Sequence, residues 1–273
     1  MEAAGVVGRL LLFAGAVRPT PLLRAAGRNV LDLPMSADRT IGQQWLAARE
    51  ELSTLLGAPP PLSVLIDRKS APPRSMPEDQ ASIQPDDVAF LGTGGVLRAA
   101  AEGLTGMMLV ATGGSLLTRP LPELLGRLMD LNADVALLAE HDGTPTGLML
   151  VSAEVMRRLP GAGYMDFKEQ CLPKIADRYQ VRVAFAADHG RVCLPIRDRE
   201  QYLEALAHHH AGRPFAIVEE GARVSPSARL LDAVVLAGAQ VGPNCVVARS
   251  VLGPGAVVGS RAVLTDRALG ASA

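Results

Sequence analysis

The stretch that decides the fold of the C-terminal part runs from Pro214 to Leu269 and reads PFAIVEEGARVSPSARLLDAVVLAGAQVGPNCVVARSVLGPGAVVGSRAVLTDRAL. An aliphatic residue returns in it about every sixth position, with an occasional five-residue step, and a small residue stands two positions before most of them. The aliphatic positions are Val218, Val224, Leu230, Val235, Val241, Val247, Leu252, Val258 and Leu264, and the small ones are Ala222, Ala228, Ala239, Cys245, Ala256 and Ala262.

This pattern is a hexapeptide repeat, in which six residues make one short strand and one turn. Three such units close a triangular coil whose inward corners admit only small or aliphatic side chains. The repeat therefore predicts a short left-handed parallel β-helix over residues 213–273, with about three coils. A β-helix of this length buries little core of its own, so we expect it to lean on the domain formed by residues 1–212.

Composition excludes several classes of function. The chain has 273 residues, a net charge of −1 and a pI of about 6.5, so no electrostatic case for nucleic acid or an anionic membrane follows. Its three cysteines, Cys171, Cys193 and Cys245, are odd in number and far apart. This spacing argues against a disulfide framework or a zinc site and indicates a reducing, cytoplasmic location.

The apolar run from Val6 to Ala16 has to be weighed as a signal peptide. Met1-Glu2 provides no basic segment before it, and the run is too short to span a bilayer. It is better explained as a buried first strand.

Apolar strand-like runs alternate with helix-like stretches before the repeat, which predicts an α/β domain with a mostly parallel sheet. Ser152 is expected to cap one helix, and Ala71–Pro85 is expected to be an irregular surface loop. The expected strands are Val7–Ala14, Leu62–Asp67, Met107–Ala111, Val135–Ala139, Leu148–Val151 and Val181–Ala186. The expected helices are Thr40–Leu56, Val96–Glu102, Leu121–Asn132, Ser152–Leu159, Phe167–Arg178 and Arg199–Ala211.

Several segments of the α/β part resemble, in order, the sugar-phosphate nucleotidyltransferases, such as mannose-1-phosphate guanylyltransferases and glucose-1-phosphate nucleotidyltransferases. Each of these motifs is weak by itself, and the resemblance is specific because several of them occur in the same order as in the family. The resemblance implies a Rossmann-like nucleotide-diphospho-sugar transferase domain followed by the β-helix. The segments are Leu10–Leu22 (LLLFAGAVRPTPL), Leu91–Leu97 (LGTGGVL), Leu109–Leu117 (LVATGGSLL), Ala133–Ala139, Thr146–Val155, Phe167–Ala176 and Cys193–Leu206.

The family joins a nucleoside triphosphate to a sugar 1-phosphate, and this reaction requires an Arg, a Lys and Mg²⁺ held by two aspartates to neutralise the phosphates. The resemblance places Arg18 at the loop arginine and Val30 at or near the lysine. It places Gly114 at the first metal-binding aspartate and Pro195 at the second. Neither Gly nor Pro can bind Mg²⁺ through its side chain. The segment that contacts the sugar in the family is skipped between Glu140 and Thr146.

The resemblance implies nucleotide contacts but no catalytic residue and no metal ligand. The Gly92–Gly95 segment before a helix is either a nucleotide contact or a purely structural turn, and Arg18 is either a phosphate contact or a surface arginine. Adjacent histidines at His208–His210 point in different directions on a helix, so they do not predict a metal site. The candidate nucleotide-binding residues are Gly15, Arg18, Gly92, Thr93, Gly94, Gly95, Gly113 and Gly114.

Together these patterns predict a catalytically impaired nucleotidyltransferase-like protein of sugar-nucleotide metabolism that acts as a ligand-sensing or regulatory subunit. We expect it to bind a nucleotide or sugar nucleotide without a cofactor and to associate with a second copy or an active paralogue. One alternative is an active NDP-sugar synthase whose Mg²⁺ is held by Asp32, Asp38 or Asp188. Another is a structural module that oligomerises through the β-helix.

Overall fold

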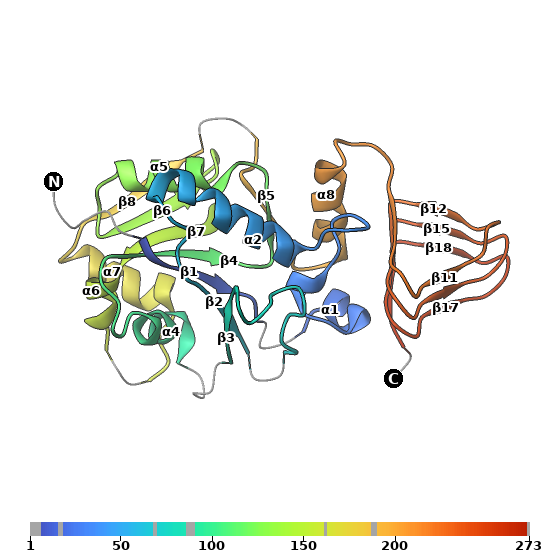
Figure 1. Ribbon diagram of the computed structural model, residues 1–273, viewed down its shortest axis with the longest axis horizontal. Helices are drawn as coiled ribbons and strands as arrows, with labels where there is room; N and C mark the ends of the chain where they lie inside the picture. Colours follow the sequence, from blue (N-terminus) through green and yellow to red (C-terminus); the bar gives the residue numbers. More distant parts are fainter. Residues whose placement is uncertain are drawn as a thin grey trace.

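The computed structural model describes residues 7–15, 19–67, 70–85, 91–160, 163–186 and 190–271. An α/β part and a β-helix lie side by side, and helices α1 (Pro21–Ala26) and α8 (Arg199–His209) stand between them (Figure 1). Within the described ranges, no helix combines the length and the apolar character that a bilayer crossing requires.

The centre of the α/β part is a seven-stranded mixed sheet with the order β3-β2-β1-β4-β7-β6-β8. Strand β7 pairs antiparallel with β4 and β6, and the other pairs are parallel. The strands are β1 (Val7–Phe13), β2 (Leu62–Ile66), β3 (Ser82–Pro85), β4 (Met107–Thr112), β6 (Val135–Ala139), β7 (Pro145–Ser152) and β8 (Val181–Phe185).

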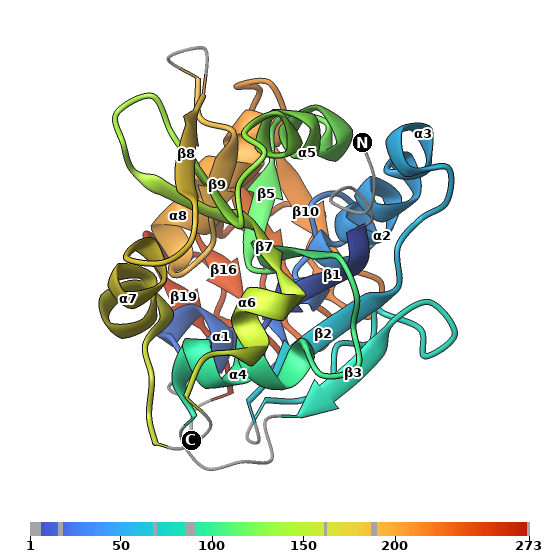
Figure 2. The same cartoon turned by 90° about the vertical axis from the view of Figure 1, so that its left-hand side faces the viewer.

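Helices cover both faces of this sheet, which explains why the second half of β1, Leu10–Phe13, is a continuous apolar run instead of an alternating one. Leu10, Leu11 and Leu12 are all fully buried although successive side chains point to opposite faces. Figure 2 shows α2 and α5 on one side of the sheet and α4, α6 and α7 on the other. The helices are α2 (Ile41–Glu51), α3 (Ser53–Leu56), α4 (Gly92–Ala100), α5 (Leu121–Asp130), α6 (Ala153–Arg157), the π-helical turn η2 (Phe167–Cys171) and α7 (Leu172–Ala176).

The strands and helices expected from the sequence are present in the structure. The structure differs from the expectation at short or atypical elements. The segment expected to be irregular up to Pro85 ends in the edge strand β3, where a proline is tolerated because the outer edge needs no donor. Helix α4 starts at Gly92, so the Gly92–Gly95 segment is its first turn and not a turn before it. Ser152 caps α6 as expected, through its hydroxyl and the Val155 amide (3.5 Å).

Besides β3, four short elements are not predicted by the sequence. They are helix α1, the 3₁₀ turn η1 (Val30–Asp32), and strands β5 (Ser115–Leu117) and β9 (Cys193–Pro195). The two strands pair antiparallel in a sheet of their own. Helix α1 has fewer than two turns and the other three elements have three residues each, so none of them carries a recognisable apolar pattern.

The C-terminal part is a three-sided coil of parallel strands, as the hexapeptide repeat predicts. Val224 pairs with Val241 and Val241 with Val258, so one coil takes 17 residues, which is two steps of six and one of five. The three sides are β10-β13-β16-β19, β11-β14-β17 and β12-β15-β18. Their strands are β10 (Ala216–Val218), β11 (Arg223–Val224), β12 (Arg229–Leu231), β13 (Ala233–Val235), β14 (Gln240–Val241), β15 (Val246–Ala248), β16 (Val251–Leu252), β17 (Val257–Val258), β18 (Val263–Thr265) and β19 (Ala268–Leu269).

The five-residue steps form tight corners that require left-handed backbone. Asp232, Arg249 and Asp266 stand one coil apart at this corner and have φ values of 49°, 43° and 56°. Asp and Asn tolerate this conformation better than most residues, whereas an arginine there is uncommon. Arg249 gains a partner in return, since its guanidinium forms a pair of hydrogen bonds with the Asp266 carboxylate (2.9 and 2.7 Å).

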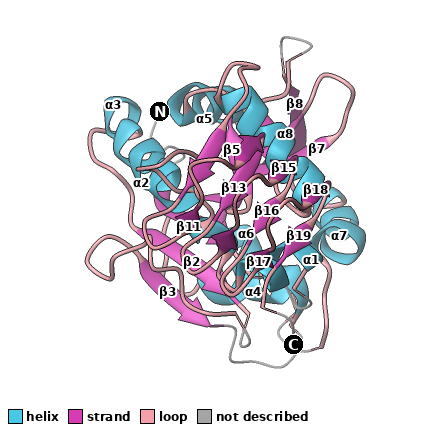
Figure 3. Cartoon of the chain, turned by 90° about the vertical axis from the view of Figure 1, so that its right-hand side faces the viewer, coloured by secondary structure: helices cyan, strands magenta, loops and turns pink. Residues whose placement is uncertain are grey.

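One side of the coil packs on the α/β part, which confirms the expectation that this short β-helix leans on the preceding domain (Figure 3). Phe215, Ile217 and Val234 are buried in the same apolar core as strands β1 and β2. A side chain at Gly253 would overlap the carbonyl oxygen of Ala25 in α1, so glycine permits a close approach there.

Candidate functional site

A cleft of about 370 Å³ lies at the carboxyl ends of β1 and β4, the edge at which open α/β sheets bind ligands. Its walls come from the start of α1, the 27–30 loop after α1, residues 70–71 after β2, and the residues that follow β9. The residues that line the cleft include Gly15, Thr20, Arg24, Arg28, Asn29, Val30, Gly114, Pro195 and Arg197.

Local hydrogen bonds build the wall beside α1. Thr20 caps α1 and Pro21 fills its first position, where no backbone donor is needed. Buried Asn29 donates from Nδ2 to the carbonyl oxygens of Ala14 (3.1 Å) and Ala71 (3.3 Å), and its Oδ1 accepts the Leu31 amide. Asn29 thereby ties the end of β1 to the loop after β2 and starts the 3₁₀ turn that carries Val30.

The positions that the sequence resemblance assigns to the lysine and the two aspartates, Val30, Gly114 and Pro195, meet in this cleft. Pro195 pairs with Ser115 across the small sheet, and the Ile196 amide donates to the Gly114 carbonyl oxygen (2.8 Å). A side chain at Gly114 would start 3.2 Å from a methyl group of Val30. Three positions that are distant in sequence are therefore neighbours in space, and none of them carries a charged side chain.

The charged residues that line the cleft are Arg24, Arg28 and Arg197, and no carboxylate is among its described lining residues. Arg28 is bound on both nitrogens by Glu219 of the β-helix (2.6 and 2.9 Å). Arg24 donates to the Pro19 carbonyl oxygen (2.8 Å) and Arg197 is exposed. Guanidinium groups suit phosphate oxygens, whereas Mg²⁺ requires oxygen ligands. The residues present fit an anion and do not fit a side-chain-bound Mg²⁺.

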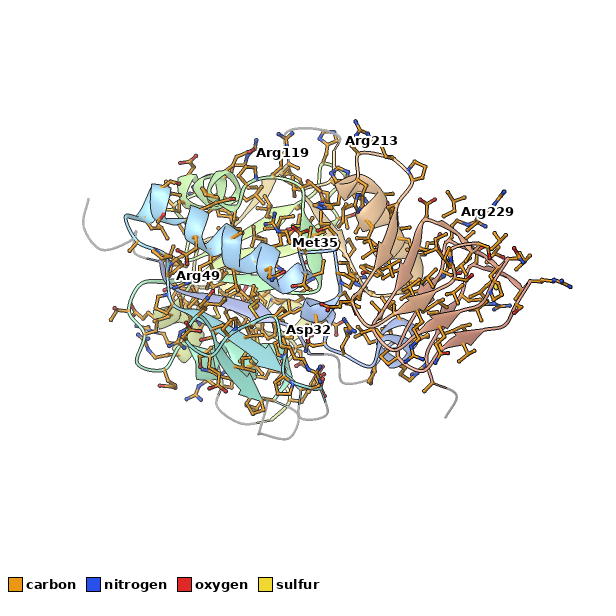
Figure 4. All side chains as sticks on the ribbon, turned by 45° about the vertical axis from the view of Figure 1, so that its right-hand side comes forward. Asp32, Met35, Arg49, Arg119, Arg213 and Arg229 are labelled. Atoms are coloured by element: carbon orange, nitrogen blue, oxygen red, sulfur yellow. The ribbon has the colours of Figure 1, made fainter. Side chains whose placement is uncertain are left out.

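Asp32 and Asp38, two of the three carboxylates proposed from the sequence as alternative metal ligands, have other hydrogen-bond partners. Asp32, near the junction of the two parts in Figure 4, is buried and accepts the backbone amides of Arg74 (3.0 Å) and Ser75 (2.8 Å). Asp38 is exposed, and the hydrogen bond from Ser36 is the main cause that lowers the pKa of its carboxyl. Asp188 lies outside the described residues. Among the described residues, no cluster of three His, Cys, Asp or Glu could hold a metal ion.

Of the predicted nucleotide contacts near the end of β1 and β4, Gly15 and Gly114 line the cleft and Gly113 does not. Gly15 is exposed at the end of β1, and a side chain there would overlap the Asp67 backbone. Gly114 is the second lining residue. Gly113 lies beneath the cleft, where its carbonyl oxygen accepts the indole N–H of buried Trp45 (2.9 Å). Arg18 lies outside the described residues.

The Gly92–Gly95 segment stands apart from the lining of this cleft and packs against residues 165–171. The Gly94 amide donates to the Met165 carbonyl oxygen (2.9 Å), and a side chain at Gly94 would start 2.5 Å from the Cys171 sulfur. Thr93 accepts the Phe167 amide (2.9 Å). This close packing explains the glycines, while a nucleotide contact here stays a prediction.

Sequence reasoning missed the arginines and Asn29 of the cleft. Arg24 and Arg28 belong to a segment without a recognisable motif, and Arg197 follows the position of the second aspartate by two residues. The sequence offers little reason to assign these arginines to a binding site, because a lone arginine in an Arg-rich chain is most often a surface residue. Only the fold brings Arg197 into the same cleft as Arg24 and Arg28.

Nearby titratable groups are structural. Burial raises the pKa of the Cys193 thiol, just before Pro195, to about 12, with a contribution from Glu140. That thiol stays protonated at neutral pH and is no nucleophile. His210 stacks on Phe215 with a ring distance of 5.2 Å and approaches the Met35 carbonyl oxygen (3.1 Å), which joins the end of α8 to the first coil.

Comparison with solved structures finds the same fold at low sequence identity. HddC from Yersinia pseudotuberculosis, a sugar-phosphate nucleotidyltransferase, matches with a TM-score of 0.55 and 12% identity, over 74% of this chain and 99% of HddC. HddC complexed with GMP-PN matches with a TM-score of 0.50 and 14% identity over the same shares. No protein-family model and no curated protein matches the chain.

At these identities the likeness shows the fold. The mixed seven-stranded sheet is like that of the nucleotidyltransferase fold, and a small region of three parallel sheets consistent with a β-helix follows it. The fold class predicted from the sequence is thereby confirmed.

Proposed function

We propose that this protein is a nucleotidyltransferase-like protein of sugar-nucleotide metabolism that binds a nucleotide or sugar nucleotide and acts as a ligand-sensing or regulatory subunit. One observation carries the proposal. The cleft at the carboxyl ends of β1 and β4 is lined by three arginines, and the positions that the resemblance assigns to the two metal-binding aspartates hold Gly114 and Pro195. Such a cleft favours phosphate groups and provides no side chain for Mg²⁺. The complex of HddC with GMP-PN supports a nucleotide as the ligand class.

Loss of turnover follows from the electrostatics of phosphoryl-type transfer. Removing one preorganised charge or donor can cost on the order of 10³-fold in rate. Here the lysine position and both aspartate positions are changed together. We therefore expect no measurable Mg²⁺-dependent pyrophosphorolysis of GDP-mannose or UDP-glucose.

Isothermal titration calorimetry with GDP, GDP-mannose and UDP-glucose, with and without Mg²⁺, tests the proposal together with a pyrophosphorolysis assay. The expected result is binding that is independent of Mg²⁺, without turnover. Turnover abolished by a chelator would instead support an active NDP-sugar synthase and direct mutagenesis to Asp32, Asp38 and Asp188. Absence of binding would support a purely structural module.

The proposed partner is a second copy of the chain or an active paralogue. The last coil supports this assignment, because its outward residues Val257 and Val263 are 67% and 72% exposed. Strands β17, β18 and β19 are also the last of their three sheets, so one edge of each is unpaired among the described strands. Exposed apolar strand edges are typical sites of association.

A further inference from the structure

The contact between Arg28 and Glu219 joins the cleft to the β-helix. Arg28 lies in the cleft wall just after α1, and Glu219 follows strand β10 in the first coil, 191 residues away. Their bidentate geometry, with distances of 2.6 and 2.9 Å, is the strong form of a guanidinium–carboxylate pair. Both side chains are about one fifth exposed. The pair is therefore partly shielded from water.

Glu219 is held in place from the β-helix side. One of its carboxylate oxygens also accepts the Ala237 amide (2.9 Å) in the next coil. Arg28 has one other acceptor among the described residues, the Asp32 carbonyl oxygen at 3.3 Å. The carboxylate is thus anchored in the coil, and the arginine depends on it for most of its hydrogen bonding.

A phosphate group in the cleft would offer Arg28 a second acceptor of the same kind. Carboxylate and phosphate oxygens both suit the two parallel N–H groups of a guanidinium. One guanidinium face cannot serve both anions fully, and the negative charge of Glu219 also repels an anion that approaches Arg28.

We propose that Glu219 of the β-helix competes with the phosphate groups of a bound nucleotide for Arg28, so that the β-helix sets the anion affinity of the cleft. This inference rests on the proposed nucleotide-binding function. Because linkage is reciprocal, a bound anion that draws Arg28 away from Glu219 also weakens the contact between the cleft and the first coil. The Arg28–Glu219 pair then couples anion binding in the cleft to the β-helix, which is the part of the molecule proposed to bind a partner.

The test uses the full chain and the variant Glu219→Gln, with pyrophosphate and GDP as probes in Mg²⁺-free buffer. The glutamine oxygen can still accept the Ala237 amide and Arg28 Nη2, while its NH₂ group faces Arg28 Nη1 as a donor, so the negative charge and one of the two hydrogen bonds to Arg28 are lost. The matched control is Glu220→Gln, which makes the same change of net charge at the exposed neighbouring residue. Calorimetry is expected to show roughly tenfold tighter binding of both probes by Glu219→Gln and little change for Glu220→Gln.

A double-mutant cycle shows whether the gain passes through Arg28. In the Arg28→Gln background, Glu219→Gln should no longer tighten binding. A purely structural role of the pair would lower the melting temperature of Glu219→Gln without tightening the probes, and would overturn the inference. Equal affinities of the two Glu→Gln variants would also overturn it.

The outcome separates this inference from the function on which it rests. If the wild type binds GDP and Glu219→Gln binds it no tighter, only the competition is wrong. If neither the wild type nor Glu219→Gln binds either probe, the proposed nucleotide-binding function fails and the competition fails with it. If only Glu219→Gln binds, Glu219 blocks the cleft in the wild type, and the inference stands.

Discussion

At the scale of single residues, the main feature of the cleft is that none of its described lining side chains is a carboxylate. Gly114 and Pro195 are brought together by the pairing of β5 and β9, and Val30 closes over Gly114. Restoring one aspartate would supply one ligand of several, because Mg²⁺ needs near-octahedral oxygen coordination. A single substitution is therefore not expected to create a Mg²⁺ site in this cleft.

Glycine at position 253 is required by the approach of α1 to the β-helix. A side chain there would overlap the Ala25 carbonyl oxygen, which is backbone and cannot rotate away. We expect Gly253→Ala to lower the free energy of unfolding by about 3 kcal/mol. Urea unfolding followed by circular dichroism measures this.

Gly259→Ala in the same coil is the control, because a side chain there meets no atom within 4 Å. It should change the free energy of unfolding by less than about 0.5 kcal/mol. Equal stabilities of the two variants would show that α1 does not sit against the coil in this way.

At the scale of elements, the β-helix owes its shape to a repeat of small and aliphatic residues around a narrow core. Val235, Val241 and Val247 occupy successive inward positions and are at most 4% exposed. Successive side chains of a strand alternate in direction, so the neighbours Gln240 and Val246 point outward and are exposed, whereas Val234 beside Val235 is buried against the α/β part.

The variant Val241→Asp places a carboxylate in the core of the coil without a partner. We expect it to destabilise the β-helix by about 4 kcal/mol, since a buried unpaired charge is among the most costly changes. The exposed neighbour in the same strand provides the control, Gln240→Asp. Limited proteolysis within residues 213–273 should rise in Val241→Asp alone, and similar proteolysis of both variants would contradict the inward placement of Val241.

At the scale of the whole molecule, the two parts share one core instead of being joined by a linker. Phe215, Ile217 and Val251 of the coil are buried in the same cluster as the α/β sheet. Truncation after Gly212 would therefore uncover apolar surface on α1 and α8, and a less soluble fragment is expected. Association is better tested by point substitutions in the full chain.

We predict that the full chain is a dimer or larger and that the last coil contributes to the contact. Val263→Glu replaces an outward side chain that is 72% exposed, so the fold should tolerate it. A charge at the contact should raise the dissociation constant about tenfold or more. Light scattering coupled to gel filtration measures the mass. A monomeric wild type would rule out self-association, and co-purification would then test an active paralogue.

The hexapeptide period and the alternating apolar runs determined both halves of the fold, because side-chain periodicity records directly which face of an element is buried. The sequence also predicted that Gly114 and Pro195 replace the metal-binding aspartates of the family, and this stays a prediction. The sequence did not predict α1, β5 and β9, since α1 has fewer than two helical turns and each of the two strands has three residues.

Only the tertiary structure decided which residues share the cleft. Arg197 is distant in sequence from Arg24 and Arg28, and the partner of Arg28 lies 191 residues further along the chain. A sequence records local periodicity, whereas the competition between a cleft arginine and a carboxylate of the β-helix depends on how two distant segments pack. That packing is set by the shared core and by the glycines that let α1 and the coil approach each other.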